Sequence, residues 1–157
     1  MKEVVSGQWL VVGLWGRLSC LLLTAYCLLA CSVPNLEQPD CTKARDIVRE
    51  FYSFHFGNDK DVSTDGLEKR RSFLTPDLFA SLKGSRTAND PFTLTDDPPK
   101  AFRVGECRVI EPGRRAAFGV LLFWRTDTRT DQRAIKVETK NVDGKWLIDA
   151  VGDAADL

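Results

Sequence analysis

Residues 116–125 read AAFGVLLFWR and are apolar at both odd and even positions. Successive side chains of a strand point to opposite faces of a sheet, so this pattern predicts a central strand that is covered on both faces. Pro112-Gly113 before it is typical of a type II turn, and the polar residues 126–132 after it predict a hairpin loop. The second half of the chain is therefore expected to form an antiparallel sheet.

Three more strands are predicted around residues 116–125. Between residues 102 and 109 the apolar positions change parity, which predicts a bulge at Gly105–Glu106. The side chains of residues 135–140 alternate between apolar or uncharged and charged, which predicts a strand with one buried and one solvent-exposed face. Asp143-Gly144 predicts a tight hairpin that leads into a last strand, Lys145–Val151. On one side of that strand we expect Trp146, Ile148 and Ala150.

Helices are predicted before the sheet. A first helix is expected from Thr42 to about Phe56, and a second over Leu67–Leu74 with Lys69-Arg70-Arg71 as its solvated face. A third helix begins after the N-cap Thr75 and ends at Gly84. Residues 85–100 are rich in Asp and Pro and predict a long loop. The apolar stripe of the first helix is Ala44, Ile47, Val48, Phe51 and His55.

Helices followed by an antiparallel meander predict an α+β domain, with N-terminal helices packed on a curved antiparallel sheet. The 157 residues carry 22 basic and 22 acidic side chains. This balance provides no basic field for nucleic acid, so no nucleic-acid partner is expected.

An apolar run, LSCLLLTAYCLLA, covers residues 18–30 and follows Arg17 and Lys2. A basic region, a short apolar region and a small residue in this order indicate a secretory signal. Two other readings stay open. Residues 9–30 are long enough for an uncleaved membrane span, although Arg17 would then lie near mid-membrane. The signal could also be cleaved to leave a soluble exported protein.

The end of this run, Leu28-Leu29-Ala30-Cys31, resembles the lipobox of bacterial lipoproteins. The resemblance implies cleavage before Cys31 and acylation of Cys31, although Leu29 stands where a small residue is commoner. It further implies a lipid-anchored protein of the cell envelope that faces the periplasm. By similarity to sorting rules in enteric-type bacteria, Ser32 favours the outer membrane. We expect a signal peptide (1–30), a lipidated Cys and tether (31–41), one domain (42–151) and a tail (152–157).

An exported chain has an oxidising environment in which disulfides form. Cys20 and Cys27 leave with the signal, and Cys31 is used for the lipid. Cys41 and Cys107 remain as a pair, which predicts a disulfide between the first helix and the sheet; two unrelated buried thiols are the alternative. His55 is the only histidine, so no metal site and no cofactor are expected.

The aromatic end of the first helix, the short helices, the loop with Asp90-Pro91-Phe92 and the closing residues 144–149, GKWLID, resemble the nuclear transport factor 2-like superfamily. Within it, the chain is similar to exported bacterial lipoproteins of unknown function. The resemblance implies a cone, a curved sheet wrapped around the first helix, often with an internal pocket. It implies no particular reaction, because this fold supports enzymes and binding modules alike.

If such a pocket exists, its expected contributors are Phe51, Tyr52, His55, Trp124 and Asp149. Plain core packing of the aromatic side chains is the commoner explanation. A small isomerase or hydrolase would need Tyr52 and a carboxylate in that pocket, and no nucleophile–base motif appears in the chain. We therefore expect no catalytic residues. The first alternative, ahead of the isomerase or hydrolase, is a periplasmic immunity or inhibitor protein that blocks a toxin or cell-wall enzyme through an acidic surface with Asp90, Asp96 and Asp97. The favoured hypothesis is a lipid-anchored envelope module that binds a protein partner or a small apolar ligand.

Overall fold

The structure is a computed structural model that describes residues 37–57, 63–85, 89–128 and 130–154. Its strands form one antiparallel sheet in the order β1-β2-β3-β4, and its helices precede them, so the α+β class is confirmed. The elements are α2 (Pro39–Gly57), α3 (Thr64–Arg70), the 3-10 helix η1 (Arg71–Phe73), α4 (Pro76–Lys83), β1 (Ala101–Glu111), β2 (Arg115–Arg125), β3 (Thr130–Val142) and β4 (Lys145–Asp153).

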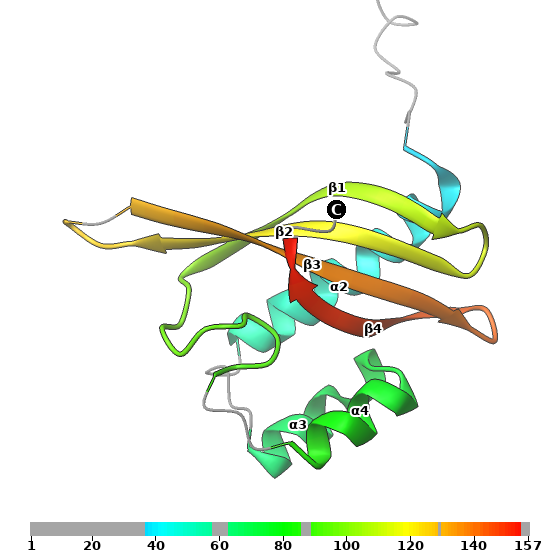
Figure 1. The fold of residues 1–157 in the computed structure, drawn as a ribbon, viewed down its shortest axis with the longest axis horizontal. Helices are drawn as coiled ribbons and strands as arrows, with labels where there is room; N and C mark the ends of the chain where they lie inside the picture. The colour runs from blue at the N-terminus through cyan, green and yellow to red at the C-terminus, as the bar shows by residue number, and fades with distance from the viewer. Residues whose placement is uncertain (1–36, 58–62, 86–88, 129, 155–157) are drawn as a thin grey trace, which may run out of the picture. The chain divides into compact units, whose positions relative to one another are not determined.

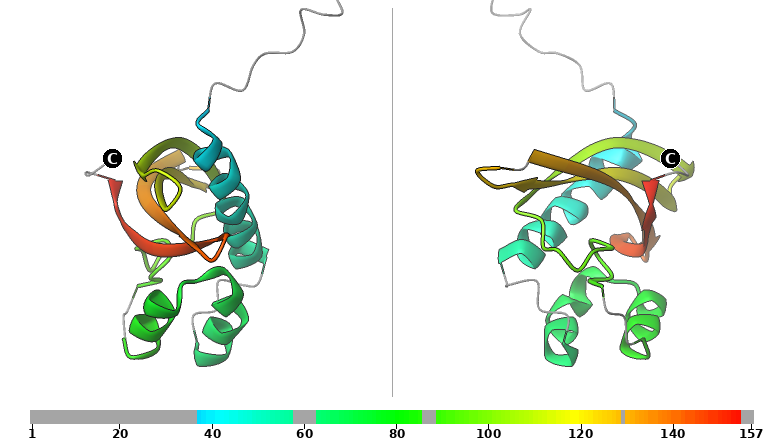
Figure 2. Two further views of the ribbon diagram at one scale, coloured as in Figure 1. Left: turned by 90° about the vertical axis from the view of Figure 1, so that its right-hand side faces the viewer. Right: turned by 60° about the vertical axis from the view of Figure 1, so that its left-hand side comes forward.

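Helix α2 lies against one face of the sheet, and the sheet curves around it (Figures 1 and 2). The apolar stripe predicted for this helix faces the sheet, and Ile47 is only partly buried. α2 begins at Pro39, three residues earlier than predicted, because a proline in the first turn loses no helical hydrogen bond. The fully buried centre of the core consists of Ala44, Val48, Phe51, Tyr52, Phe118, Val120, Leu122, Ile135, Val137 and Ile148.

The two short helices follow their capping residues. α3 begins at Thr64 rather than Leu67, because the Ser63 hydroxyl accepts a hydrogen bond from the Gly66 amide at 3.2 Å. α4 confirms its prediction: Thr75 accepts from the Leu78 amide, and the helix ends before Gly84. The Thr75 amide also donates to the Ile148 carbonyl at 2.9 Å, which fixes the start of α4 to β4.

The turns and the first bulge agree with the sequence. Val104 pairs with Val120 and Cys107 with Phe118, so the extra residue of β1 lies at Gly105–Glu106 as predicted. Gly113, in the turn between β1 and β2, has a φ of 74°, which favours glycine. Asp143 and Gly144 both have positive φ, as a two-residue hairpin of type I′ requires.

The prediction that β2 is covered on both faces is wrong. Phe118, Val120 and Leu122 are fully buried, whereas Leu121 and Phe123 on the opposite face are partly exposed. In the part of the chain that the structure describes, α2 lies only against the face that carries the buried residues. The apolar character of the other face therefore needs another explanation. We call this half-exposed side the outer face of the sheet.

The predicted side of the last strand is right for Trp146 and Ile148 and wrong for Ala150. Thr139 pairs with Ile148, but Glu138 pairs with Ala150, so Asp149 is an extra residue of β4. This bulge in β4 shifts the alternation by one position. Ala150 therefore lies opposite Glu138, on the outer face.

Candidate functional site

Three polar side chains meet beneath the C-terminal half of α2. Arg70 of α3 donates from Nε to His55 Nδ1 at 3.0 Å, and His55 Nε2 lies 2.8 Å from Asp90 Oδ2. Arg70 and His55 are fully buried, and the Asp90 side chain is 13% exposed. We call these residues the Arg70–His55–Asp90 chain. It links α2, α3 and the loop before β1.

The hydrogen-bond donors fix the tautomer of the histidine. A guanidinium has only N–H donors, so His55 Nδ1 must accept, and its Nε2–H donates to Asp90. His55 is thus a neutral imidazole hydrogen-bonded to the Arg70 guanidinium on one side and to the Asp90 carboxylate on the other. Asp90 also accepts from the Phe92 amide at 2.8 Å, and Arg70 donates to the Gly66 carbonyl at 2.6 Å. These bonds occupy groups that would otherwise be costly to bury.

Tyr52 lies beside this chain and is equally enclosed. Its hydroxyl donates to the Phe92 carbonyl at 2.8 Å, and the side chain is fully buried. Burial, with a smaller contribution from the charge of Asp90, raises the pKa of the Tyr52 phenol well above its ordinary value. The phenol therefore stays protonated, and its donor is used inside the protein.

The structure brings together three of the five expected pocket residues. Phe51, Tyr52 and His55 pack against one another, with Phe51 and Tyr52 ring centroids 5.1 Å apart. Phe92 adds an edge contact to Phe51 at 4.9 Å, so this region is packed with side chains. The other two expected residues lie elsewhere, Asp149 at the β4 bulge and Trp124 at a surface hollow.

That hollow has a volume of about 430 Å³ and is acidic. Trp124 forms one wall, and its indole N–H donates to the Asp97 carbonyl at 2.9 Å, which fixes the ring. Asp96, Asp97 and Asp131 are exposed around it. Asp90, expected on the same acidic surface, instead points to His55.

A second hollow, of about 400 Å³, lies on the outer face of the sheet, and we call it the outer-face hollow. Two glycines on neighbouring strands, Gly105 and Gly119, belong to its lining, and their backbones approach closely, since a Cβ at Gly105 would lie 3.1 Å from the Gly119 carbonyl oxygen. Leu121 supplies the apolar part of the lining. The residues that line it are Gly105, Glu106, Cys107, Arg108, Gly119, Leu121 and Ala134.

Charged side chains border the outer-face hollow. Arg103 pairs in register with Leu121, and both Arg103 and Arg108 are exposed. On the opposite border, Lys136 and Glu138 form an ion pair at 3.3 Å. The outer-face hollow thus combines an apolar floor with charged side chains at two of its borders.

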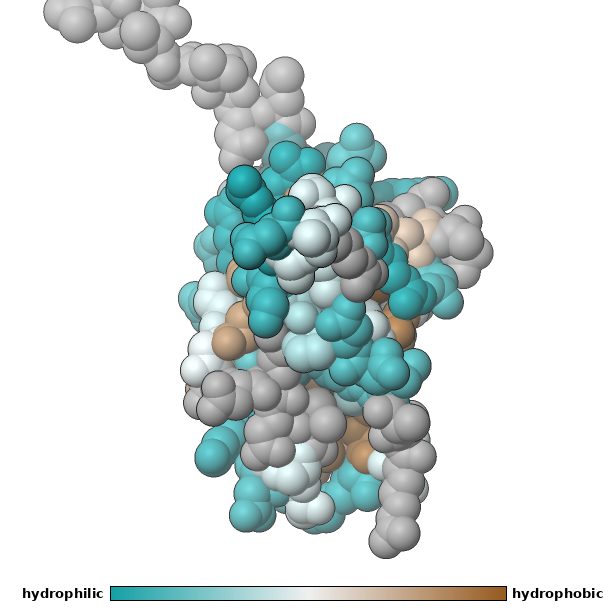
Figure 3. All heavy atoms as spheres, turned by 90° about the vertical axis from the view of Figure 1, so that its left-hand side faces the viewer, coloured by the Kyte–Doolittle hydropathy of each residue, from teal (hydrophilic) through white to brown (hydrophobic). Residues whose placement is uncertain are grey.

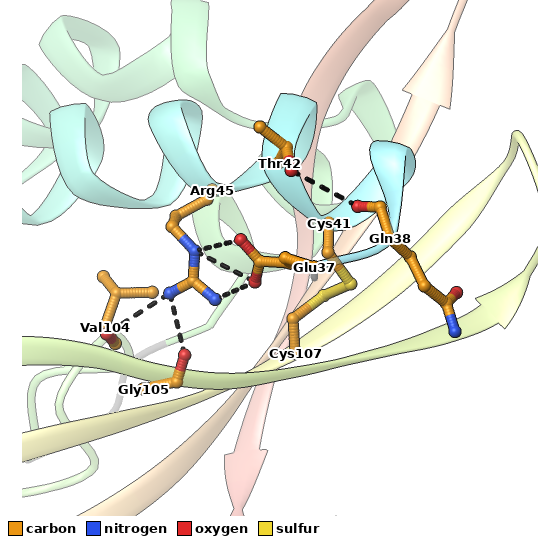
Figure 4. A network of polar contacts seen from close by, with 8 residues as sticks. All are labelled: Glu37, Gln38, Cys41, Thr42, Arg45, Val104, Gly105 and Cys107. Atoms are coloured by element: carbon orange, nitrogen blue, oxygen red, sulfur yellow. Dashed lines mark hydrogen bonds and ion pairs between the residues drawn. A yellow bond between two sulfur atoms is a disulfide. The ribbon is translucent and has the colours of Figure 1, made fainter. Parts of the chain in front are cut away.

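The N-terminus of α2 is fastened to β1 (Figure 4). Cys41 and Cys107 form the predicted disulfide. Arg45 forms an ion pair with Glu37 and donates to the Gly105 carbonyl, which lies at the β1 bulge, at 2.7 Å. The hydrogen bond from Arg45 holds the pKa of the Glu37 carboxyl below its ordinary value. We call the disulfide and the Glu37–Arg45 pair the α2 clamp.

One group of metal-ligating types occurs among the described residues: Glu37, Cys41 and Cys107. Both sulfur atoms belong to the disulfide, and the carboxylate is bonded to Arg45. This donor set does not fit a metal ion, because a thiolate is needed for ligation.

Cys31, the expected lipidation residue, lies outside the described residues, as do the predicted signal and most of the tether. Within the described part, no helix is both long and apolar enough to cross a bilayer.

Comparisons with family models, with curated proteins and with solved structures found no match to this chain.

Arg70 and Asp90 do not lie where the sequence predicts. The sequence predicts a solvated run Lys69-Arg70-Arg71, but Arg70 is fully buried. A signal was present, because Arg70 stands three positions after Leu67, on the buried side of α3. The partnership of His55 with Asp90, 35 positions later, has no local signal in the sequence.

Proposed function

We propose that this protein is a lipid-anchored binding module of the bacterial cell envelope, with a nuclear transport factor 2-like domain that holds a protein partner on the outer face of its sheet. The observation that carries the proposal is the outer-face hollow, an apolar floor around Leu121 on a face without a covering helix among the described residues. A curved antiparallel sheet wrapped around α2 supports the choice of fold.

The interior supports binding rather than catalysis. Tyr52, which an isomerase would need together with a carboxylate, is fully buried and donates to the Phe92 carbonyl. His55 beside it is fully buried and bonded to Arg70 and Asp90. General acid–base catalysis needs such groups within hydrogen-bond reach of a substrate. With the interior packed, the groups that a partner can reach lie on the sheet surface.

The envelope location is supported by the lipobox resemblance at Leu28–Cys31 and by the disulfide. Disulfides persist in oxidising compartments, which include the periplasm. The α2 clamp is also suited to an anchored protein, because the segment from Cys31 enters the domain at α2. A disulfide there fastens the entry point to the sheet covalently.

Lipidation is tested by intact mass and acyl labelling of the protein from bacterial membranes, beside Cys31→Ala. We expect the wild type to begin at Cys31 with added lipid mass and the variant to lack it. A mass that includes residues 1–30 would overturn the anchor.

Partner binding is tested by a photo-crosslinking residue at Leu121 in the same membranes. The matched control places that residue at Ser81, which lies on α4 and not on the sheet. We expect one discrete adduct from position 121, unchanged between preparations, and none from position 81. Equal labelling from both positions would contradict a binding site on the outer face.

A further inference from the structure

Strand β3 is longer than its neighbour β4. It begins at Thr130, whereas the last pair between these strands is Ile135 with Asp153. Residues 130–134 therefore pair with β2 on one side only. Figures 1 and 2 show this part of the hairpin projecting beyond β4. We call residues 130–134 the free edge.

The free edge is open to solvent. All five of its residues are exposed, and outside the β2 ladder no backbone hydrogen bond joins them to another described residue. Figure 3 looks onto the end of the molecule from which the hairpin projects and shows a mainly hydrophilic surface there. Backbone groups on an unpaired strand edge can pair with a further strand.

The charged residues of the free edge are complementary to those of a second, antiparallel copy of the same edge. Its sequence is Thr-Asp-Gln-Arg-Ala, with Asp131 and Arg133 placed symmetrically about Gln132. We propose that a second copy of this chain pairs antiparallel along the free edge, with Gln132 on the two-fold axis. Asp131 of each copy then lies opposite Arg133 of the other, and Thr130 lies opposite Ala134. The sheet continues across both copies.

The register follows from the charges. Directly opposed residues in antiparallel strands share a face, so the two-fold axis must pass through a residue. An axis at Asp131 would oppose two carboxylates, and an axis at Arg133 would oppose two guanidinium groups, both unfavourable. Among the described residues of the free edge, only the axis at Gln132 places Asp131 opposite Arg133 on both sides.

Arg133 is already held in position for this role. It donates to the Leu94 carbonyl at 3.1 Å and to Asp153 at 2.6 Å, and its side chain is still 42% exposed. A guanidinium has five N–H donors, so these two bonds leave donors for Asp131 of the other copy. Charged residues on an edge strand commonly prevent pairing with another strand. Here the two charges are of opposite sign and lie symmetrically on either side of Gln132, so they favour pairing with a second copy of the same chain.

This pairing does not depend on the proposed lipid anchor, although anchoring would raise the local concentration of copies. The test uses full-length protein with Gln132→Cys, oxidised with copper phenanthroline in membrane and soluble fractions and analysed on non-reducing gels. Opposed residues have Cα atoms about 5 Å apart, within disulfide range. The matched control is Ala134→Cys, on the same face of the same strand. Its two copies would lie roughly 14 Å apart, too far to bridge.

We expect a covalent dimer from Gln132→Cys and none from Ala134→Cys. Adding Asp131→Arg to Gln132→Cys should abolish the dimer, because two guanidinium groups then face each other. Asp127→Arg makes the same charge change in the hairpin loop and should leave the dimer intact. Equal crosslinking of both cysteine variants, or none from Gln132→Cys, would overturn the pairing. The mass of the same samples reports acylation separately, so failure of the anchor is distinguishable from failure of the dimer.

Discussion

At the residue scale, the buried polar groups act as structural ties. The Arg70–His55–Asp90 chain carries a cation and an anion into the interior with a neutral imidazole between them. Buried charges are tolerated only when they are paired and hydrogen-bonded. Each member therefore matters more for stability than its type suggests.

Asp90→Ala tests how much the Arg70–His55–Asp90 chain contributes to stability. The change removes the carboxylate that accepts from the buried His55 Nε2–H and leaves that donor without its acceptor, so we expect a loss of about 3 kcal/mol in the free energy of unfolding. The measurement is urea unfolding followed by circular dichroism. The control, Asp96→Ala, changes an exposed residue of the same loop and should alter stability by less than about 0.5 kcal/mol. Similar midpoints for the two variants would refute the structural role of the chain.

Glu37 gives the fold a pH dependence of known sign. Its folded-state pKa is held below the ordinary value of 4.5. The Glu37–Arg45 pair therefore adds stability above that value, and the stability is lost as pH falls through the lowered pKa. The side chain is 23% exposed, so we expect less than about 1 kcal/mol. Wild type should exceed Glu37→Gln in stability near neutral pH, and the difference should vanish in acid. A difference that persists in acid would rule out this linkage.

At the element scale, β2 separates the core from the outer face. Leu121 and Leu122 are neighbours of the same type with different environments. Leu122 is fully buried, and Leu121 lies in the lining of the outer-face hollow. Strand alternation alone makes this division.

Two alanine substitutions compare the contributions of the buried and the outer face of β2 to stability. Leu122→Ala should lower the free energy of unfolding by roughly 2 to 5 kcal/mol, because it leaves a cavity in the core. Leu121→Ala removes a half-exposed side chain, and we expect a loss below about 1 kcal/mol. Thermal unfolding of both variants gives the comparison. If the two losses are equal, the outer face is covered in solution.

The disulfide joins α2 to β1 across 66 positions of sequence. Replacing both Cys41 and Cys107 by Ala should cost roughly 4 kcal/mol, since the cross-link restricts the unfolded chain. Urea unfolding with and without reductant measures it. Reductant should destabilise the wild type to the level of the double variant and leave that variant unchanged. If the stability of the wild type stays the same after its disulfide has been reduced, the disulfide does not stabilise the fold in this way.

At the scale of the whole molecule, the described core packs α2 and the short helices against one face of the four-stranded sheet. Contacts also divide the chain at Leu36, so the described part forms its own compact unit. The domain should therefore fold independently of the segment that we assign to export.

Deleting residues 1–30 tests this independence. We expect the midpoint of urea unfolding to stay within error of the full-length protein, because the residues from Glu37 onward form a compact unit through their own contacts. The comparison needs matched detergent, and circular dichroism checks that the helix and strand content is unchanged. A lower midpoint would mean that residues 1–30 pack against the domain.

The sequence by itself determined the elements whose signals are local. Thr75 and Pro76 fixed the start of α4, Gly105–Glu106 gave the β1 bulge, and Asp143-Gly144 gave the hairpin. Each depends on the hydrogen bonds or the dihedral angles of neighbouring residues. The disulfide partners followed from elimination, because only two cysteines remain after the proposed processing.

Tertiary structure decided the rest. Arg70 is buried because α3 packs toward His55. Asp90 does not lie on the acidic surface, because its loop brings it to the same histidine. The Asp149 bulge and the half-exposed outer face of β2 also depend on which elements meet. A local pattern records which side chains are apolar and how the backbone turns. It does not record which elements cover a face, because that depends on contacts between residues far apart in the chain.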